Sequence, residues 1–247
     1  MKGLFGIKYI IFCGLFMLVV FFSTTVTAQD EDEVYSYSRE FVWGVSKSTN
    51  SGLIAGLAIK FGRRISENRF QSLGVEIVNI KHPREVRYPS SISGSTFIWG
   101  KQNYLFSIRP NYGREWVIFK KAPQQGVQIN AILAGGPSLG LVAPYYIRRR
   151  GRDFNSGTEP WNPNIEFDQI DGSGPFLKGL GDASIVPGAN VKAGVSFEFG
   201  TFKNDVTGFE VGFQLDAYTR NIVIMPAASR RSLYPAAYIM LFYGNRQ

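Results

Sequence analysis

The segment FEVGFQLDA, residues 209–217, alternates strictly between two kinds of side chain. Because successive side chains of a β-strand point to opposite faces, this segment predicts a strand with one apolar face and one polar or small face. The apolar positions are Phe209, Val211, Phe213, Leu215 and Ala217, and the positions between them are Glu210, Gly212, Gln214 and Asp216.

Other segments of the chain alternate in the same way, so we expect eight strands. The boundaries of the fifth stay open because it contains several glycines together with Pro137 and Pro144, and proline is disfavoured inside a sheet. The expected strands cover residues 40–47, 53–61, 70–81, 102–112, 127–147, 189–199, 209–221 and 236–243.

The first 28 residues have the features of a secretory signal. Lys2 and Lys8 give a positive start, an apolar run covers residues 9–22, and Val26 to Ala28 supplies the small residues of a cleavage site. An uncleaved membrane anchor is the alternative, but the run is shorter than the roughly 20 residues that cross a bilayer as a helix. We expect cleavage after Ala28.

The rest of the chain divides into a short tail and one domain. Residues 29–38 are polar, with four acids in a row at 30–33, and we expect a solvated tail. Residues 39–247 have a length that suits a single all-β domain. The only cysteine, Cys13, follows Phe12 inside the signal, which argues against lipidation and leaves the mature chain without disulfides.

The charge balance narrows the class of partner. The chain has 27 basic and 19 acidic residues, and removal of Lys2 and Lys8 with the signal lowers the net charge from +8 to +6. A basic protein can bind nucleic acid, but a secretory signal argues against that partner. Phosphate-bearing lipid head groups are the expected anionic partners instead.

The connections between the expected strands alternate in length. The second, fourth and sixth are comparatively short, whereas the third, residues 82–100, and the fifth, residues 148–188, are long. Outer-membrane barrels have short periplasmic turns, longer outer loops and an even number of strands. The pattern predicts an eight-stranded antiparallel transmembrane β-barrel with long outer loops and both mature termini in the periplasm. A soluble secreted β-sandwich is the alternative fold.

Aromatic residues gather near the strand ends predicted to be periplasmic, as expected at a membrane interface. Strands are rich in aromatic residues in any case, so this observation supports the topology without deciding it. The residues concerned are Phe61, Phe70, Tyr112, Trp116, Phe119, Phe199, Phe202 and Tyr243.

The signal, the eight alternating segments and the aromatic-rich final strand, Tyr238 to Tyr243, resemble the small outer-membrane barrels of the OmpA/OmpX type, in the form common in Bacteroidota. Such a final strand resembles the signal read by the barrel assembly machinery. Here the chain continues to Gln247 instead of ending on an aromatic residue, so the match is imperfect. The resemblance is architectural and carries no catalytic motif.

Charged residues on the predicted inward face form the first candidate site. An eight-stranded barrel is only wide enough for side chains to fill its interior, and charges of mixed sign can pair there. We therefore expect a plugged, salt-bridged lumen, with a narrow gated pore or proton path as the alternative. The candidates are Glu40, Lys60, Glu76, Arg109, Lys192, Glu198, Asp216 and Arg220.

A run of arginines beyond the fifth strand forms the second candidate site. Arginine forks match phosphate groups, and lipopolysaccharide phosphates lie near the outer rim of such a barrel. Ordinary solvated charge is the alternative. The run comprises Arg148, Arg149, Arg150 and Arg152, and other outer loops contribute Arg84, Arg87, Arg230 and Arg231.

Evidence for a metal site, a cofactor or catalysis is weak. The acids of the long loop do not have the spacing of a calcium loop, and no cluster of cysteine and histidine exists for zinc. His82 is the sole histidine, and Ser90, Ser91 and Ser93 follow it without a compact His-x-Ser arrangement. Some small barrels modify lipid A with a histidine near the outer rim, so that activity is an alternative. We expect no cofactor.

The expected function is that of a non-enzymatic outer-membrane barrel. Its partners would be outer-membrane lipid and lipopolysaccharide, and the resemblance to Bacteroidota barrels implies an accessory role in a larger export or assembly machine. The aromatic residues of the long loop, including Trp161 and Phe176, are expected to fold onto the barrel mouth, with a partner-binding surface as the alternative. A lipid A-modifying enzyme and a narrow channel are the alternatives.

Overall fold

The computed structural model describes residues 38–120, 126–150, 156–199, 205–228 and 230–246. The expected signal, nearly all of the expected acidic tail, Phe202 and Arg152 lie outside the described residues. In the described parts, no helix has the length and apolarity needed to cross a membrane.

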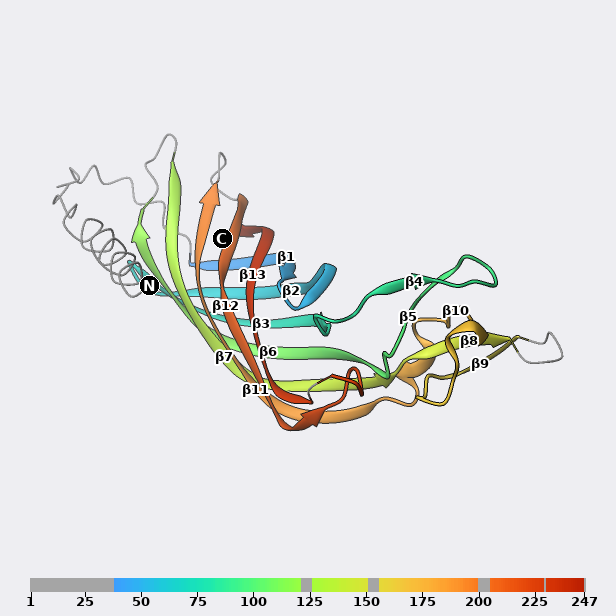
Figure 1. Cartoon of the computed structure of the whole chain (residues 1–247). Coiled ribbons are helices and arrows are strands. Elements are labelled where there is room, and N and C mark those ends of the chain that lie inside the picture. Colours follow the sequence, from blue (N-terminus) through green and yellow to red (C-terminus); the bar gives the residue numbers. More distant parts are fainter. Residues whose placement is uncertain (1–37, 121–125, 151–155, 200–204, 229, 247) are drawn as a thin grey trace, which may run out of the picture. The chain divides into compact units, whose positions relative to one another are not determined.

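Within those residues, eight long antiparallel strands close into a barrel (Figure 1). The strands follow one another around the barrel in chain order, and the first pairs with the last. The expected all-β, eight-stranded antiparallel fold is therefore confirmed. The barrel strands are β1 (Arg39–Ser48), β2 (Ser51–Ser66), β3 (Arg69–Ile80), β6 (Asn103–Phe119), β7 (Val127–Pro144), β11 (Ser184–Phe199), β12 (Asp205–Ile222) and β13 (Arg231–Arg246).

Each barrel strand lies where the alternation predicts one, but most are longer. β6 continues to Phe119 instead of ending at Tyr112, because its backbone keeps pairing with β3 and β7. The fifth expected strand, 127–147, was too long: β7 ends at Pro144, and the Tyr145 amide donates to the carbonyl of Gln102. The chain then enters a different sheet.

The strand pairing is staggered around the barrel. The Arg64 amide donates to the Ser38 carbonyl at 3.0 Å, and the row of register partners that starts there returns to β1 at Ser48. A barrel closed with such a stagger has strands that tilt relative to its axis. The row passes through Phe70, Glu115, Ile132, Gly194, Gly212 and Tyr238.

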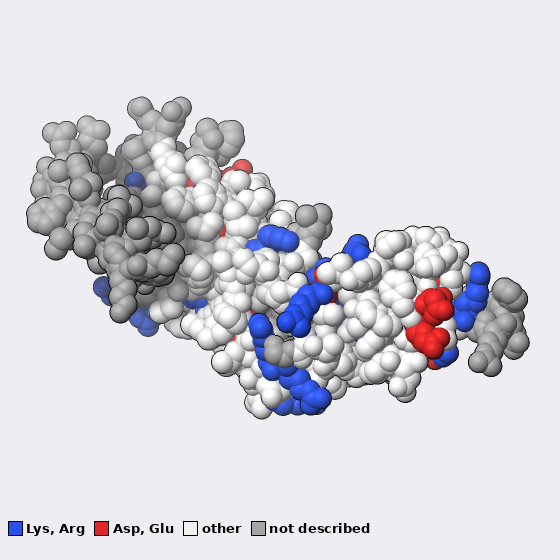
Figure 2. All heavy atoms as spheres, viewed as in Figure 1, with Lys and Arg blue, Asp and Glu red and all other residues white. Residues whose placement is uncertain are grey.

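Side chains alternate between the inside and the outside of the barrel. On β13, for example, Tyr238, Met240 and Phe242 are buried, whereas Ile239 and Leu241 are exposed. The outward face is apolar although nothing covers it in the described structure. Figure 2 accordingly shows a wide uncharged surface over the barrel strands, which is the reverse of an ordinary soluble protein.

The barrel has two different ends. We call one the terminal end, because β1 begins and β13 ends there, and the other the loop end. The connections at the terminal end are short: residues 67–68, 120–126 and 200–204. The connections at the loop end include two long ones, 81–102 and 145–183.

These two long connections form a small structure of their own, which we call the loop extension. It contains a two-stranded sheet and a three-stranded sheet in the order β10-β8-β9. A buried cluster that includes Phe97, Tyr145, Ile147, Trp161 and Ile170 joins the two connections. The elements are β4 (Arg87–Pro89), β5 (Thr96–Ile98), β8 (Tyr146–Arg150), β9 (Ser156–Pro160), η1 (Phe167–Gln169), β10 (Ile170–Ser173) and η2 (Lys178–Leu180).

Candidate functional site

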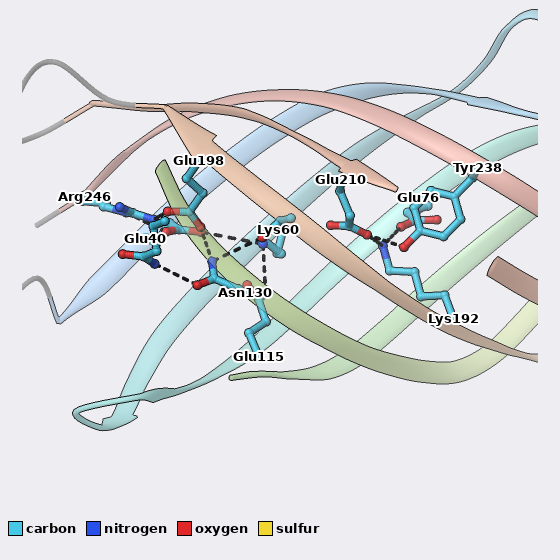
Figure 3. Close-up of polar contacts among 12 residues, drawn as sticks. Glu40, Lys60, Glu76, Glu115, Asn130, Lys192, Glu198, Glu210, Tyr238 and Arg246 are labelled. Carbon is cyan, nitrogen blue, oxygen red and sulfur yellow. Dashed lines mark hydrogen bonds and ion pairs between the residues drawn. The ribbon is translucent and has the colours of Figure 1, made fainter. Parts of the chain in front are cut away.

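Near the terminal end, inward-facing charges form a first group, which we call the terminal cluster (Figure 3). Lys60 Nζ lies 2.9 Å from Glu115 Oε1 and 3.7 Å from Glu40 Oε1. Arg246 Nε lies 2.8 Å from Glu40 Oε2, and Arg246 also pairs with Glu198. The Asn130 amide donates to Glu198 at 2.5 Å. The cluster therefore links β1, β2, β6, β7, β11 and β13 across the barrel.

A second group, which we call the central cluster, lies farther from the terminal end of the barrel. Lys192 Nζ lies 2.5 Å from Glu76 Oε1 and 3.1 Å from Glu210 Oε1, and the Tyr238 hydroxyl donates to Glu210 at 2.6 Å (Figure 3). These contacts join β3, β11, β12 and β13. They satisfy the buried Lys192 ammonium with two carboxylates, as a desolvated cation requires.

Arg109 extends the central cluster to a further strand, β6. Its Nε and Nη2 donate to the two carboxylate oxygens of Asp216 at 2.7 and 2.6 Å, and its Nη1 lies 3.7 Å from Glu76 Oε2. Arg109 is 2% exposed and Asp216 is fully buried. This two-pronged pairing is the strongest geometry available to an arginine and a carboxylate.

A small cavity of about 30 Å³ lies between side chains of the two clusters, lined by Lys60, Glu76, Glu115 and Lys192 among others. Asn111 also lines it, and both polar atoms of its buried amide lack a partner among the described residues. A cavity of this size accommodates about two water molecules, and a water there would satisfy the Asn111 amide. The lumen is therefore filled by side chains and has no wide passage at this level.

Toward the loop end, the interior becomes apolar. Ile80, Leu105, Val186, Tyr218, Ile222, Ile224 and Tyr234 form a buried cluster there. Ile224 belongs to the connection between β12 and β13, and its carbonyl accepts from the Gln102 amide. The two ion-pair clusters thus lie behind an apolar layer at this end of the barrel.

Most of the expected lumen charges come together. Glu40, Lys60 and Glu198 belong to the terminal cluster, and Glu76, Arg109, Lys192 and Asp216 belong to the central cluster.

Arg220 does not join them: it is exposed, and it donates to the Ser184 hydroxyl at 3.0 Å. The reason is local, because the pairing of β12 with β13 shifts register after Ala217 and the pairing with β11 ends at Tyr218. The inward alternation that predicted Arg220 in the lumen is interrupted there, and Ile222 is the next buried residue of β12.

Sequence reasoning missed Glu115 and Arg246, because the expected strands ended at Tyr112 and Tyr243. The signal was present, since polar or small residues at 111, 113 and 115 continue the inward alternation of β6. Instead of four acids and four bases, the described network contains four bases and six acids. The bases are Lys60, Arg109, Lys192 and Arg246, and the acids are Glu40, Glu76, Glu115, Glu198, Glu210 and Asp216.

The expected arginine site is partly engaged within the loop extension. Arg149 lies 3.2 Å from Glu159, and Arg148 donates to the Ser95 hydroxyl at 3.2 Å. Arg150 is exposed at the end of β8, and Arg152 lies outside the described residues. Two members of the run therefore have contacts within the protein.

His82 lies at the base of the loop extension beside a buried ion pair. Its Nδ1 accepts from the Arg84 amide at 3.1 Å, and its own amide donates to Glu85. Glu85 also pairs with Lys101 Nζ at 2.7 Å, and Lys101 is fully buried. Burial lowers the pKa of His82, and burial also lowers the pKa of Lys101 although Glu85 opposes that change.

The serines that follow His82 have structural contacts. The Ser90 hydroxyl donates to the Ile170 carbonyl, and the Ser93 hydroxyl donates to the Asp171 carbonyl, both at 2.7 Å. Both bonds join the two long connections to each other. In the part of the chain that the structure describes, no group of three or more histidine, cysteine or acidic residues is placed to hold a metal ion.

The aromatic residues of the long connection are mostly packed. Trp161 is buried and meets Trp99 edge-on at 6.0 Å, and Phe167 contacts Phe97. Phe176 packs against Tyr104 and Phe106, so it lies beside the outer wall of β6.

No protein-family model and no curated protein sequence matches this chain. Among solved structures, it is similar to the N-terminal β-barrel domain of Pseudomonas aeruginosa OprF, with 10% identity over 86% of this chain and 98% of that one and a TM-score of 0.38.

It is also similar to two other solved proteins. One is Ail, the attachment invasion locus protein of Yersinia pestis, in complex with a heparin analogue, with 9% identity, 86% and 100% coverage and a TM-score of 0.38. The other is Neisserial surface protein A, with 13% identity, 85% and 95% coverage and a TM-score of 0.32.

Proposed function

We propose that the chain is an outer-membrane protein whose barrel crosses the bilayer. The support is the outward face, where large apolar side chains lie exposed on neighbouring strands; Phe213, for example, is 74% exposed. Exposed apolar surface on this scale is costly in water, whereas a closed barrel leaves no unpaired strand edge in lipid. Other members of this face are Leu57, Ile59, Phe61, Leu73, Val75, Ile77, Leu133 and Leu241.

The proposed orientation places the terminal end in the periplasm and the loop end outside. The short connections at the terminal end and the long ones at the loop end support it, because outer-membrane barrels sort their loops in this way. Protease added to intact cells should then cut within residues 145–183. Cleavage only after the cells are opened would contradict the orientation.

The lumen is proposed to be closed. The observation that carries this is the combination of two cross-barrel ion-pair clusters with the buried apolar layer around Leu105. An ion would have to break several buried pairs and then pass an apolar constriction, both of which are costly. Purified protein in planar bilayers should show no steady conductance steps, and regular single-channel steps would contradict a closed lumen.

The proposed role is that of a non-enzymatic accessory subunit that presents the loop extension to a partner. The support is that the two long connections form a folded structure with its own buried core. Hydrogen bonds such as the one from the Ser90 hydroxyl to the Ile170 carbonyl hold it together. A folded projection suits protein recognition better than loose loops do, because less entropy is lost on binding.

Purification of the protein from detergent-solubilised outer membrane tests this role. A large partner at fixed stoichiometry is expected, and its loss after deletion of residues 156–173 would assign the contact to the loop extension. Recovery of the protein alone, under conditions that preserve other outer-membrane complexes, would contradict the accessory role.

Lipopolysaccharide is the proposed lipid partner at the loop end. Arg150 is exposed, and Arg84 and Arg230 lie exposed in other connections at the same end. Arginine binds phosphate in a two-pronged geometry, so these side chains suit the phosphates of lipid A. The triple variant of Arg84, Arg150 and Arg230 to Gln should retain less lipopolysaccharide after purification; unchanged retention would contradict the contact.

A further inference from the structure

The outer wall of the barrel has a gap where β6, β7 and β11 run side by side. Tyr112, Gly135 and Val191 are register partners on these three strands and belong to the outward-facing row. Gly135 has no side chain, so the row is interrupted between a tyrosine and a valine. The next row toward the terminal end continues from Arg114 to Leu133 and then to the small Ala193.

The gap is part of a measurable groove. Its volume is about 330 Å³, within the range of small-ligand sites. Tyr112, Trp116 and Leu133 are among its walls, and the polar groups that reach it include Arg114. The groove lies on the apolar surface that faces lipid in the proposed function. Lipid acyl chains would therefore surround it and contact its walls.

Arg114 is unusual for its position. It is exposed on the outward face of β6, two residues from Tyr112 on one side and two residues from Trp116 on the other. Within the described residues its guanidinium has neither an ion pair nor a hydrogen bond. An arginine on the lipid face of such a barrel is costly at the midplane of the bilayer and much less costly near the interface.

The surroundings of Arg114 favour an anion. Gln71 is its register partner on β3, and Arg69 lies two residues farther along that strand on the same face. On the next strand, Arg63 pairs with Gln71, and Arg39 pairs with Arg63. Like charges on directly opposite residues repel each other unless an anion lies between them. The described part of this face provides no carboxylate for any of the four arginines.

We infer that this groove binds a phospholipid of the periplasmic leaflet, with one acyl chain against Gly135 and Val191 and the phosphate on Arg114. Two features agree on this ligand: an apolar channel fits the chain, and an unpaired guanidinium beside interfacial aromatic rings fits the phosphate. A partner protein would need an acidic side chain at the same depth in the bilayer, which is a rarer arrangement than a lipid phosphate.

The inference rests on the proposed membrane location, and the experiment separates the two. The full mature chain is refolded into vesicles of phosphatidylcholine with phosphatidylglycerol, extracted in mild detergent and analysed by native mass spectrometry for retained lipid. We expect one retained phosphatidylglycerol per barrel. Arg114→Gln should lower the retained fraction about tenfold, since one charge-assisted phosphate contact is lost.

Two pairs of variants act as matched controls. Arg220→Gln removes an exposed arginine of β12 that lies outside the groove and outside the group of four arginines, and it should leave retention unchanged. Val191→Trp fills the groove and should lower retention, whereas Leu241→Trp places the same ring on the exposed wall of β13 and should not. Heat-modifiable migration on gels shows for each variant that the barrel is folded.

The outcomes are distinct. If the wild-type chain does not insert into vesicles, the membrane location itself is wrong. If it inserts but retains no lipid, or if Arg114→Gln and Arg220→Gln lower retention equally, the groove is not a specific phospholipid site. If Val191→Trp retains as much lipid as Leu241→Trp, the acyl chain does not lie in the groove.

Discussion

The barrel interior and the loop extension are held together by different kinds of interaction. Inside the barrel, the central contacts are ion pairs such as Arg109 with Asp216, and Arg109 is almost fully buried. In the loop extension, the centre is a cluster of rings and aliphatic side chains around Trp161 and Ile170. The difference follows from the surroundings, because an apolar outer wall leaves the polar residues of each barrel strand pointing inward.

This contrast predicts which kind of substitution destabilises each region. A buried ion pair is only a weak source of net stability, but removal of one partner leaves an unpaired buried charge. A buried ring contributes through its packing, so its removal costs the lost contacts and the cavity left behind. The first kind of damage should affect the whole barrel and the second only the loop extension.

The largest effect is expected for Arg109→Met. Asp216 is fully buried, and this change leaves its carboxylate without its two-pronged partner. The free energy of unfolding in vesicles should fall by about 4 kcal/mol. Urea titration followed by heat-modifiable gel migration measures it.

The double variant with Asp216→Asn should recover much of this loss, because no charge then remains unpaired. Arg220→Met is the matched control, since Arg220 is exposed and outside the network, and it should change stability by less than about 0.5 kcal/mol. Equal effects of Arg109→Met and Arg220→Met would show that the central cluster has no special role in holding the barrel.

The next effect concerns the loop extension. Ile170 is fully buried in its cluster, so Ile170→Ala should destabilise the extension by about 3 kcal/mol. Limited proteolysis within residues 145–183 should accelerate, while the heat-modifiable migration of the barrel stays unchanged. A matching loss of barrel stability would show that the two regions unfold as one unit.

A smaller effect is expected from pH at the base of the loop extension. The pKa of His82 is lowered by burial and by Arg231 and Arg84, while Glu85 opposes them. The Nδ1 atom also accepts from the Arg84 amide, which a protonated imidazole cannot do. The unfolded chain therefore binds a proton more readily than the folded one, and stability is lost as the pH falls below about 6.5.

Proteolysis within residues 81–102 should thus accelerate between pH 7 and pH 5. His82→Gln should remove this dependence while leaving the cleavage rate at pH 7 similar. An unchanged pH profile in the variant would assign the effect to another group.

The smallest effect is expected for Arg149→Ala. Its pair with Glu159 is solvent-exposed, with both side chains about 40% accessible. Exposed pairs contribute at most about 1 kcal/mol, and salt screens them. Proteolysis of the loop extension should change little, and any change should vanish at high salt. A loss comparable with that of Ile170→Ala would mean that ion pairs, and not rings, hold the extension.

The barrel was more predictable than its interior. Alternation over segments such as 209–217 is a local property, so the strands could be located from the chain alone. Strand ends were less certain, because pairing beyond Tyr112 and Tyr243 depends on neighbouring strands, and Glu115 and Arg246 were missed for that reason.

The loop extension was the least predictable region. Its strands are short and irregular, and its core joins residues from connections that are far apart in the chain. The hydrogen bond between Ser90 and Ile170 links positions 80 residues apart. No local pattern specifies such a contact, because the energy of the cluster arises only when both connections meet.

By itself, the sequence determined which face of each strand is apolar and which is polar, since side-chain direction in a strand follows position alone. That was sufficient to predict eight strands, an apolar wall and charges such as Lys60 and Asp216 on the inside. Only the tertiary structure decided which charges pair, that the acids outnumber the bases, and that Arg220 is excluded. Those outcomes depend on the stagger between strands and on a register shift after Ala217, which bring together residues that no local pattern connects.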